Sequence, residues 1–511
     1  MRSFKVSKLF AIFVTVSILS TSSATAEDSK SEFNGKLLPP AQGQFQITFN
    51  QGADGNFGER YSAQVKPSDV FDPTRELPNY RAILPACLLP TDLTCIESIE
   101  SKKVNEAVWK KGSLSTNQLD VGKVKVSESQ PKWREYGTWK ADPLTGKPAG
   151  GVASSWDLAA TPHKEGVSYL AIVQFQASLL DNQNAFNPEL GFSELNGMIQ
   201  PWSWKCAESG FCDWLGSAVA KNDATSVFPP NTEFRITVRT NFLGSKIGSW
   251  MVGRLEKPTI KFDSEKLVIA GKPVSYPMGF LNFKSREECA SKIESVMTKY
   301  FPRAPRTCSP PSSGFSTNSN DDVALPLFDV LDGEVTQNGE VENWTFSNGR
   351  KSNRIAVCSD PKNFSLATSN AMLYSVNPPV WDKDSSTLSY RIASTHLDRK
   401  SELNKGNYSL VISKKLADCL WNFDTAKASA EISITSSEGS RNIAVSAMRT
   451  STDWIYFDAS GFTFSAPEIK VKLINKAATT ETKTITCVKG AKLKKVSGLK
   501  PKCPTGYKAK K

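Results

Sequence analysis

Ten cysteines, all downstream of an export-type N-terminus, constrain the fold of this chain more than any other feature. An even cysteine count in an exported chain favours disulfides over free thiols. Economy of loop closure and the domain boundaries given below favour pairing between neighbours in the order 87–95, 206–212, 289–308, 358–419 and 487–503, and other connectivities stay open. The candidate residues are Cys87, Cys95, Cys206, Cys212, Cys289, Cys308, Cys358, Cys419, Cys487 and Cys503.

Metal binding is the weaker interpretation of these cysteines. The chain has no C-x-x-C pair, and its two histidines, His163 and His396, lie beside no cysteine pair, whereas zinc sites use such ligands at short spacings. Glycine-rich phosphate loops are also absent. We therefore expect no metal and no other cofactor.

The N-terminus has the three parts of a secretory signal. Arg2, Lys5 and Lys8 precede the apolar run Leu9–Ser20, and Ala24-Thr25-Ala26 forms an A-x-A cleavage site. The apolar run is shorter than the ~20 residues that a membrane span needs, and no later segment is long and apolar enough to replace it. We expect residues 1–26 to be removed, and the mature chain to be secreted, extracellular or envelope-associated, with no transmembrane segment.

Positive charge is concentrated at the C-terminal end. The formal net charge is +12, of which three charges belong to the signal; residues 476–511 carry eleven lysines against Glu481. Residues 27–475 are therefore close to neutral. The basic character belongs to the tail, and we expect no nucleic-acid partner.

Strand patterns dominate the rest of the chain and predict an all-β fold. Residues 45–49, 96–99, 234–239 and 430–434 alternate apolar and polar side chains, and the continuous apolar run 168–175 is typical of a strand buried on both faces. Short strands separated by Gly, Pro, Asn and Asp predict tandem antiparallel β-sandwich domains.

One packing helix is predicted near 285–301. Ser285 and Glu288 form a capping box, apolar residues recur behind it at helical spacing, and Pro302 ends the run. We expect this helix to lie between domains, with a Cys289–Cys308 disulfide attaching it to the segment that follows.

The predicted organisation places the main boundary in a Pro/Ser-rich linker, because residues 309–322 hold few core residues. The glycine- and proline-rich segment 142–151 is a second position where the upstream region could divide. The resulting parts are a signal peptide at 1–26, a β-rich region at 27–300, a linker at 301–322, a β-sandwich domain at 323–475 and a cationic module at 476–511.

Residues 323–475 are loosely immunoglobulin-like. Cys358, Trp381 and Cys419 follow the order of the immunoglobulin pattern, but Ala417 stands where a tyrosine corner would place Tyr. We therefore predict a sandwich without claiming that topology.

The tail predicts a small hairpin closed by a disulfide. Residues 484–488 and 494–497 alternate around Gly490, and a unit this small needs a staple such as Cys487–Cys503. Its charge would attract polyanions, with a strength that falls as salt rises; the alternative is an end that only favours solubility. The candidate polyanion contacts are Lys489, Lys492, Lys494, Lys495, Lys500, Lys502, Lys508, Lys510 and Lys511.

Tryptophans gather near one cysteine pair. Trp202, Trp204 and Trp214 surround Cys206 and Cys212 and could stack against sugar rings. Tryptophans also fill sandwich cores, and core packing is the favoured interpretation. A second cluster consists of Trp133, Tyr136, Trp139 and Trp156.

No catalytic constellation emerges. G-x-S-x-G is absent, so neither histidine has a predicted nucleophile. Glu189 and Glu194 could serve as paired carboxylates of a glycosidase, but acidic residues are frequent throughout the chain. Residues 54–56 and 329–334 resemble calcium loops only faintly, because the alternating ligand spacing is missing.

Several stretches resemble a family of exported actinobacterial proteins that lack a defined biochemical function. They are 86–99, 228–254, 388–393, 418–421 and 461–467, and the tail elements TCVKG and KCPTGYK resemble a C-terminal module of such surface proteins. The resemblance implies an envelope location and a β-architecture, and it supplies no functional residues.

These patterns predict a secreted, non-catalytic, envelope-associated protein. We expect it to be an interaction or structural surface protein, retained through its cationic tail by anionic envelope polymers or a surface protein partner. The alternative is a secreted glycan-active hydrolase with paired carboxylates and a tryptophan-lined groove. A third possibility is a purely architectural role in a surface layer.

Overall fold

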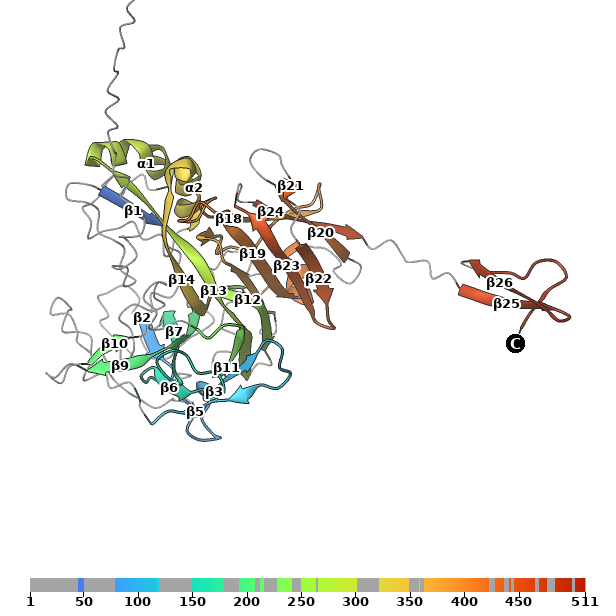
Figure 1. Ribbon diagram of the computed structural model, residues 1–511, viewed down its shortest axis with the longest axis horizontal. Coiled ribbons are helices and arrows are strands. Elements are labelled where there is room, and N and C mark those ends of the chain that lie inside the picture. The colour runs from blue at the N-terminus through green and yellow to red at the C-terminus, as the bar shows by residue number, and fades with distance from the viewer. Residues whose placement is uncertain are drawn as a thin grey trace, which may run out of the picture.

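The structure, a computed structural model, is dominated by β-strands, and the all-β prediction is confirmed (Figure 1). The signal segment, most of 142–151 and most of the linker 301–322 lie outside the described residues. The structure describes residues 45–49, 79–116, 118, 149–178, 193–206, 212–215, 228–240, 250–262, 265–300, 321–348, 358, 363–421, 428–435, 441–442, 445–464, 468–475, 483–498 and 501–510.

Within these residues, sixteen strands hydrogen-bond into one sheet whose central path runs β22-β23-β19-β15-β12-β13-β14-β8-β7-β6-β5. All its pairs are antiparallel except β12 with β15, which is parallel. The strands are β1 (Phe45–Phe49), β2 (Asn79–Ile83), β3 (Thr94–Lys103), β4 (Lys110–Lys111), β5 (Ser113–Leu114), β6 (Ser154–Asp157), β7 (Ser168–Ser178), β8 (Ser193–Pro201), β11 (Thr232–Thr240), β12 (Trp250–Phe262), β13 (Lys266–Phe283), β14 (Thr336–Asn348), β15 (Ser365–Ser369), β19 (Lys405–Ser413), β22 (Val445–Thr450) and β23 (Trp454–Thr463).

Three smaller sheets complete the described strands. One has six strands: β16 (Leu373–Tyr374), β17 (Val380–Asp382), β18 (Thr387–Ala393), β20 (Ala428–Thr435), β21 (Arg441–Asn442) and β24 (Glu468–Asn475). Another pairs β9 (Ser203–Cys206) with β10 (Cys212–Leu215), and the last joins β25 (Lys483–Lys489), β26 (Lys492–Gly498) and β27 (Lys508–Ala509).

The predicted strands form where the patterns place them. Residues 45–49, 96–99, 234–239 and 430–434 lie in β1, β3, β11 and β20. Residues 169–175 of β7 are all buried, which confirms the strand predicted to be covered on both faces.

The long strand β13 changes partners along its length. Its first part pairs with β11 and β12, and from Val274 onward it pairs with β14 and β1. Pro273 lies where the strand partners change, and Pro277 lies further along β13. Because proline has no amide hydrogen, each of them removes one hydrogen bond between strands. The pairing with β14 shifts register just after Pro277, between Met278 and Gly279.

Strands β12, β15 and β19 form a wall shared by two hydrophobic cores. Along β12, Met251 and Leu255 enter the first core, whereas Trp250 and Val252 enter the second. The first core is completed mainly by β3, β7, β8, β11, β13 and β14; the second is completed by β18, β23, β24 and the helix α4 (Lys414–Trp421). Successive side chains of a strand point to opposite faces, so one wall serves both sandwiches.

This shared wall changes the predicted organisation. Strand β14 follows the linker in sequence, but it pairs with β8, β12 and β13, which precede the linker. β15 likewise pairs with β12. The two sandwiches are therefore not separate tandem sheets: backbone hydrogen bonds cross the boundary placed at 301–322.

Helix α1 (Arg286–Tyr300) forms where it is predicted. The backbone N–H of Glu288 donates to Ser285 Oγ at 3.2 Å, and the Glu288 carboxylate accepts from the N–H of Lys284 at 2.9 Å, one residue earlier than an ideal capping box. Cys289 is buried and disulfide-bonded, and its predicted partner Cys308 lies outside the described residues.

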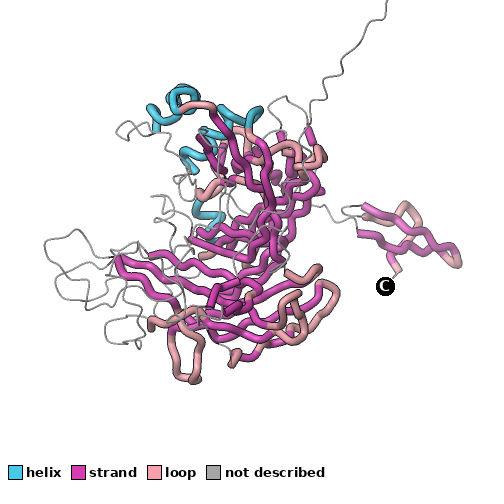
Figure 2. The backbone as a smooth tube through the Cα atoms, turned by 60° about the vertical axis from the view of Figure 1, so that its left-hand side comes forward, coloured by secondary structure: helices cyan, strands magenta, loops and turns pink. Residues whose placement is uncertain are grey.

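Three further helices in the described part of the chain, among them the α4 given above, were not predicted. Helix α2 (Asp321–Leu331), followed by the short 3₁₀ helix η3 (Asp332–Glu334), begins at the end of the predicted linker, and Pro326 within it obscured its helical pattern. Residues of α1 and α2 pack with Leu281 and Phe283 of β13 as a third core. Figure 2 shows these helices gathered at one end of the molecule.

Three predicted disulfides are present: Cys87–Cys95, Cys358–Cys419 and Cys487–Cys503. Cys206 and Cys212 face each other as register partners of β9 and β10. Cys419 lies on α4, whereas the second immunoglobulin cysteine lies on a strand, so this disulfide does not follow the immunoglobulin pattern.

Candidate functional site: the cationic tail sheet

The tail forms a three-stranded antiparallel sheet that lies apart from the rest of the molecule in Figure 1. β25 pairs with β26 through a turn at Gly490, whose φ of 57° favours glycine, and with β27 on its other side. The predicted hairpin is confirmed, and β27 is an addition that the sequence did not reveal.

The Cys487–Cys503 disulfide closes this sheet. Cys487 is fully buried at the centre of β25, and the N–H of Lys510 donates to the carbonyl oxygen of Thr486 at 2.7 Å. Since a unit this small has little apolar core, the staple and the backbone ladder hold its shape.

The tail lysines lie on both faces of the sheet. By register, Lys489, Lys492 and Lys494 share the face of Cys487, while Lys495 and Lys508 share the opposite face with Val488. All the candidate lysines whose side chains are described are exposed, and Lys500 and Lys511 lie outside the described residues: the exposed set is Lys489, Lys492, Lys494, Lys495, Lys502, Lys508 and Lys510.

The placement of these charges does not serve the stability of the sheet. Lys489 lies directly opposite Lys492 in the ladder, and like charges in such pairs are destabilising. Residues 482–511 contain no aspartate or glutamate to balance them. The arrangement favours an external anionic partner.

One exposed residue of the tail sheet, Leu493, is not among the residues predicted for this site. Leu493 is 61% exposed, and Val488 is its register partner on the face that also carries Lys495. The sequence Lys492-Leu493-Lys494-Lys495 could have indicated this exposed leucine. An exposed leucine among lysines adds apolar surface to the cationic face.

Trp202 packs in the interior, as the favoured interpretation predicted, and the alternative of stacking against sugar rings is wrong for it. Its side chain is 1% exposed, and its Nε1–H donates to Ser155 Oγ at 2.7 Å. The indole is therefore part of the protein interior. Trp156 is also buried. Trp204 and Trp214 face each other across β9 and β10, but their side chains lie outside the described residues.

His163 is a buried structural residue. Its Nε2 lies 2.8 Å from the carbonyl oxygen of Ser168, and its Nδ1 lies 3.2 Å from the backbone N–H of Glu165. Nε2 must therefore carry the proton while Nδ1 accepts, which requires the neutral ring. Burial lowers the pKa of His163, although the hydrogen bond to Ser168 and the charge of Glu165 oppose this.

We expect His163 to make the protein less stable in acid. The unfolded state binds a proton near pH 6.5, whereas the folded state resists it, so the contribution is complete above pH 6.5 and is lost as the pH falls through the folded pKa. His163→Gln should reduce this loss between pH 8 and pH 5, as measured by urea-unfolding midpoints. The exposed His396 provides the control His396→Gln; an equal change in both variants would contradict the assignment.

The carboxylates considered for catalysis have no described side chain, and two of those considered for calcium binding form ion pairs. Glu194 lies on β8 with its side chain outside the described residues, as is the whole of Glu189. Asp329 forms an ion pair with Arg391, and Glu334 forms one with Lys292. In the part of the chain that the structure describes, no group of three or more His, Cys, Asp or Glu residues could hold a metal ion.

Among the described helices, none has the combined length and hydropathy needed to cross a bilayer. A scan of protein-family models and a search of curated proteins find no match to this chain.

Proposed function

We propose that this protein is a secreted, non-catalytic, envelope-associated protein, an interaction or structural surface protein that its tail sheet retains on polyanionic material. The observation that carries the proposal is the disulfide-closed sheet with exposed lysines on both faces and no acidic residue to neutralise them. Resemblance of the tail to modules of exported actinobacterial proteins supports an envelope location. Anionic envelope polymers are the partners that this charge distribution favours.

The alternative of a glycan-active hydrolase is less well supported. Its groove would use Trp202, Trp204 and Trp214, of which Trp202 is buried, and its candidate carboxylates Glu189 and Glu194 have no described side chain. We therefore retain the non-catalytic proposal alone.

Removing the tail charges should abolish salt-sensitive binding to isolated actinobacterial cell envelopes. Near an anionic surface each lysine is worth about 1 kcal/mol, so replacing six of them removes about 6 kcal/mol and should weaken binding roughly 10⁴-fold. Binding is measured by co-sedimentation across a salt series. The substitutions to glutamine are at Lys489, Lys492, Lys494, Lys495, Lys508 and Lys510.

The matched control removes the same charge from the body of the protein. It replaces six exposed lysines with glutamine, at Lys164, Lys261, Lys284, Lys383, Lys400 and Lys405. If both variants lose affinity equally, net charge and not the tail sheet governs retention. If binding of the tail variant persists at 0.5 M salt, recognition resides in the sandwiches.

A further inference from the structure

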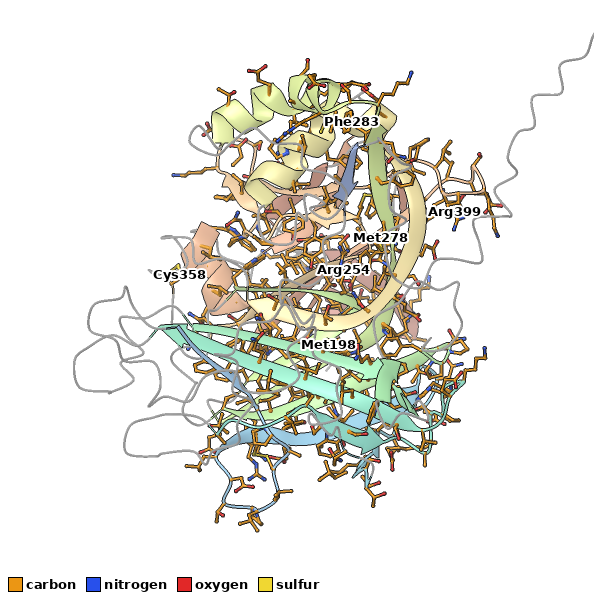
Figure 3. All side chains as sticks on the ribbon, turned by 90° about the vertical axis from the view of Figure 1, so that its left-hand side faces the viewer. Met198, Arg254, Met278, Phe283, Cys358 and Arg399 are labelled. Carbon is orange, nitrogen blue, oxygen red and sulfur yellow. A yellow bond between two sulfur atoms is a disulfide. The ribbon has the colours of Figure 1, made fainter. Side chains whose placement is uncertain are left out.

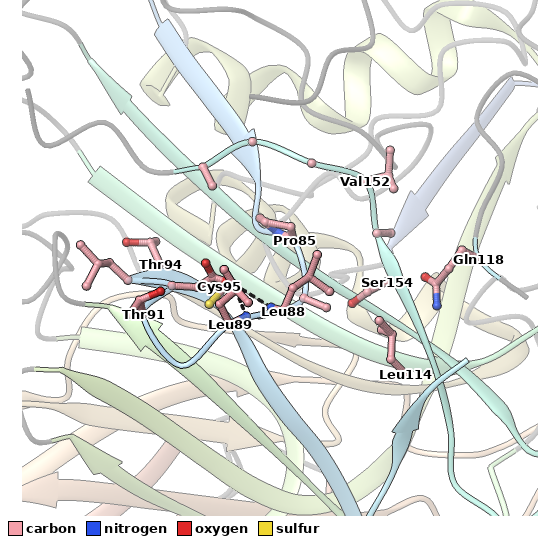
Figure 4. Close-up of a pocket in the computed structure, with 17 residues that line it drawn as sticks. Pro85, Leu88, Leu89, Thr91, Thr94, Cys95, Leu114, Gln118, Val152 and Ser154 are labelled. Carbon is pink, nitrogen blue, oxygen red and sulfur yellow. Dashed lines mark hydrogen bonds between the residues drawn. The ribbon is translucent and has the colours of Figure 1, made fainter. Parts of the chain in front are cut away.

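A cavity of about 960 Å³ lies beneath the loop closed by Cys87–Cys95 (Figure 4). Its other walls are the segment from Ala149 to Ser154 and the side chains of Leu114 and Gln118. Its volume is within the range of small-molecule pockets, which are typically 300–1,000 Å³.

The lining is mainly apolar. The side chains that set its character are Leu88, Leu89, Leu93, Leu114 and Val152. Leu88 is 76% exposed and Leu89 is 60% exposed, a large apolar area for a loop on the surface of the molecule. Such a lining favours a hydrocarbon ligand.

The loop holds these leucines in a fixed position. Asp92 Oδ2 accepts from the backbone N–H groups of Leu88 at 2.7 Å and Leu89 at 2.8 Å, which are the dashed lines of Figure 4. From β11, Arg239 Nη1 donates to the carbonyl oxygens of Pro90 at 2.7 Å and Asp92 at 2.9 Å. The disulfide and these hydrogen bonds hold the loop, so the leucines cannot collapse freely onto the sheet. Ligand binding therefore costs little additional conformational entropy in this loop.

A single buried hydroxyl in the lining lacks a partner. Thr94 is 2% exposed, and its Oγ1 makes no hydrogen bond. Ser154 Oγ accepts from Trp156 Nε1, and Gln118 bonds to the backbone of Ser155. Thr94 Oγ1 has almost no accessible surface, so a ligand in the cavity does not reach it, and the described lining offers mainly apolar contact.

The described lining of the cavity disfavours an anionic head group. Asp92 is the only charged residue among the lining residues, and its carboxylate already accepts two backbone hydrogen bonds. Among the described lining residues there is no lysine or arginine to compensate a carboxylate or phosphate, and an uncompensated charge is expensive to bury.

We propose that this cavity binds the hydrocarbon chain of an uncharged lipid. The chain packs against the leucines and Val152. The site is independent of the tail sheet. The sequence signal was the presence of three leucines within the short cysteine loop CLLPTDLTC.

The test uses the purified full chain with intact disulfides and the uncharged fluorescent probe N-phenyl-1-naphthylamine. We expect saturable binding that 1-tetradecanol displaces at least tenfold more effectively than tetradecanoate, since the carboxylate has the same chain but carries a charge. Absence of saturable binding, or equal displacement by the two competitors, would overturn the proposal.

Two variants locate the site. Val152→Trp fills the cavity and should weaken probe binding at least tenfold, whereas Val380→Trp, at a 62% exposed position on β17, should not change it. Equal effects would place the probe elsewhere. Circular dichroism and the melting temperature establish that each variant is folded.

A second copy of this chain could instead cover the leucines. In that case sedimentation would show a dimer that Leu88→Ser/Leu89→Ser dissociates, with no probe binding, and the lipid proposal would fail.

Discussion

Replacing Arg254 with methionine is expected to lower the free energy of unfolding by about 3–5 kcal/mol. Arg254 lies on β12 and is fully buried (Figure 3). Its Nη1 donates to the carbonyl oxygens of Ser369, at 2.8 Å, and Ala371, and its Nη2 donates to that of Met372 at 3.1 Å. Methionine would fill much of the volume but leave three buried acceptors without these donors.

Two aromatic rings add to this loss. The guanidinium carbon lies 3.8 Å from the ring centroid of Tyr276 and 4.4 Å from that of Tyr374. Burial raises the pKa of Tyr276, against the effects of Arg254 and the hydrogen bond from Asn343, so its ring stays neutral. Cation–π contacts that are removed from water contribute about 2 kcal/mol or more. Arg254 thus joins β12 and β13 to the turn after β15.

Urea unfolding followed by tryptophan fluorescence measures the effect, with Arg449→Met as the matched control. Arg449 also lies over a tyrosine ring, 4.8 Å from the centroid of Tyr456, and pairs with Asp458, but its side chain is 59% exposed. An exposed pair contributes about 0–1 kcal/mol. Losses of similar size in the two variants would contradict the role assigned to burial.

Removing the Cys358–Cys419 disulfide is expected to destabilise the protein by about 4 kcal/mol. The two cysteines are 61 positions apart, and the loop-closure entropy that a cross-link removes from the unfolded chain increases with loop length. Cys358 is 7% exposed, and the disulfide fixes α4, whose Leu416 and Trp421 are buried in the second core. The variant Cys358→Ala/Cys419→Ala avoids burying new hydroxyl groups.

The comparison variant is Cys87→Ala/Cys95→Ala, which opens a loop between cysteines only 8 positions apart. The same relation gives about 2.5 kcal/mol for it. Differential scanning calorimetry of both double variants compares the two losses. If the short-loop variant is the less stable protein, loop-closure entropy does not determine the ranking.

Local features of the fold were predictable because neighbours in sequence decide them. The alternation in 234–239 and the apolar run 168–175 mark strands regardless of partner, and Ser285 with Glu288 marks the start of α1. The three disulfides observed join cysteines that follow one another in sequence. The tail sheet was predictable for the same reason, because its first two strands meet through a short turn.

The lysines of the tail site were predicted from the sequence, but its third strand and its exposed apolar side chain were not. Counting lysines located Lys489, Lys492 and their neighbours, but the third strand β27 and the exposed Leu493 depend on pairing register. For Trp202 the sequence favoured core packing over stacking on sugars, and packing against Ser155 does bury the ring.

The sequence by itself determined the strand-rich class, the neighbouring disulfides and the cationic end of this protein, since periodicity, cysteine order and charge act over short distances along the chain. Only the tertiary structure decided that β12, β15 and β19 serve two cores, that Arg254 is buried between tyrosines, and that the leucines of the Cys87–Cys95 loop border a cavity. These features depend on which distant strands pair and in which register, and a shift of one residue would exchange the two faces of every strand involved.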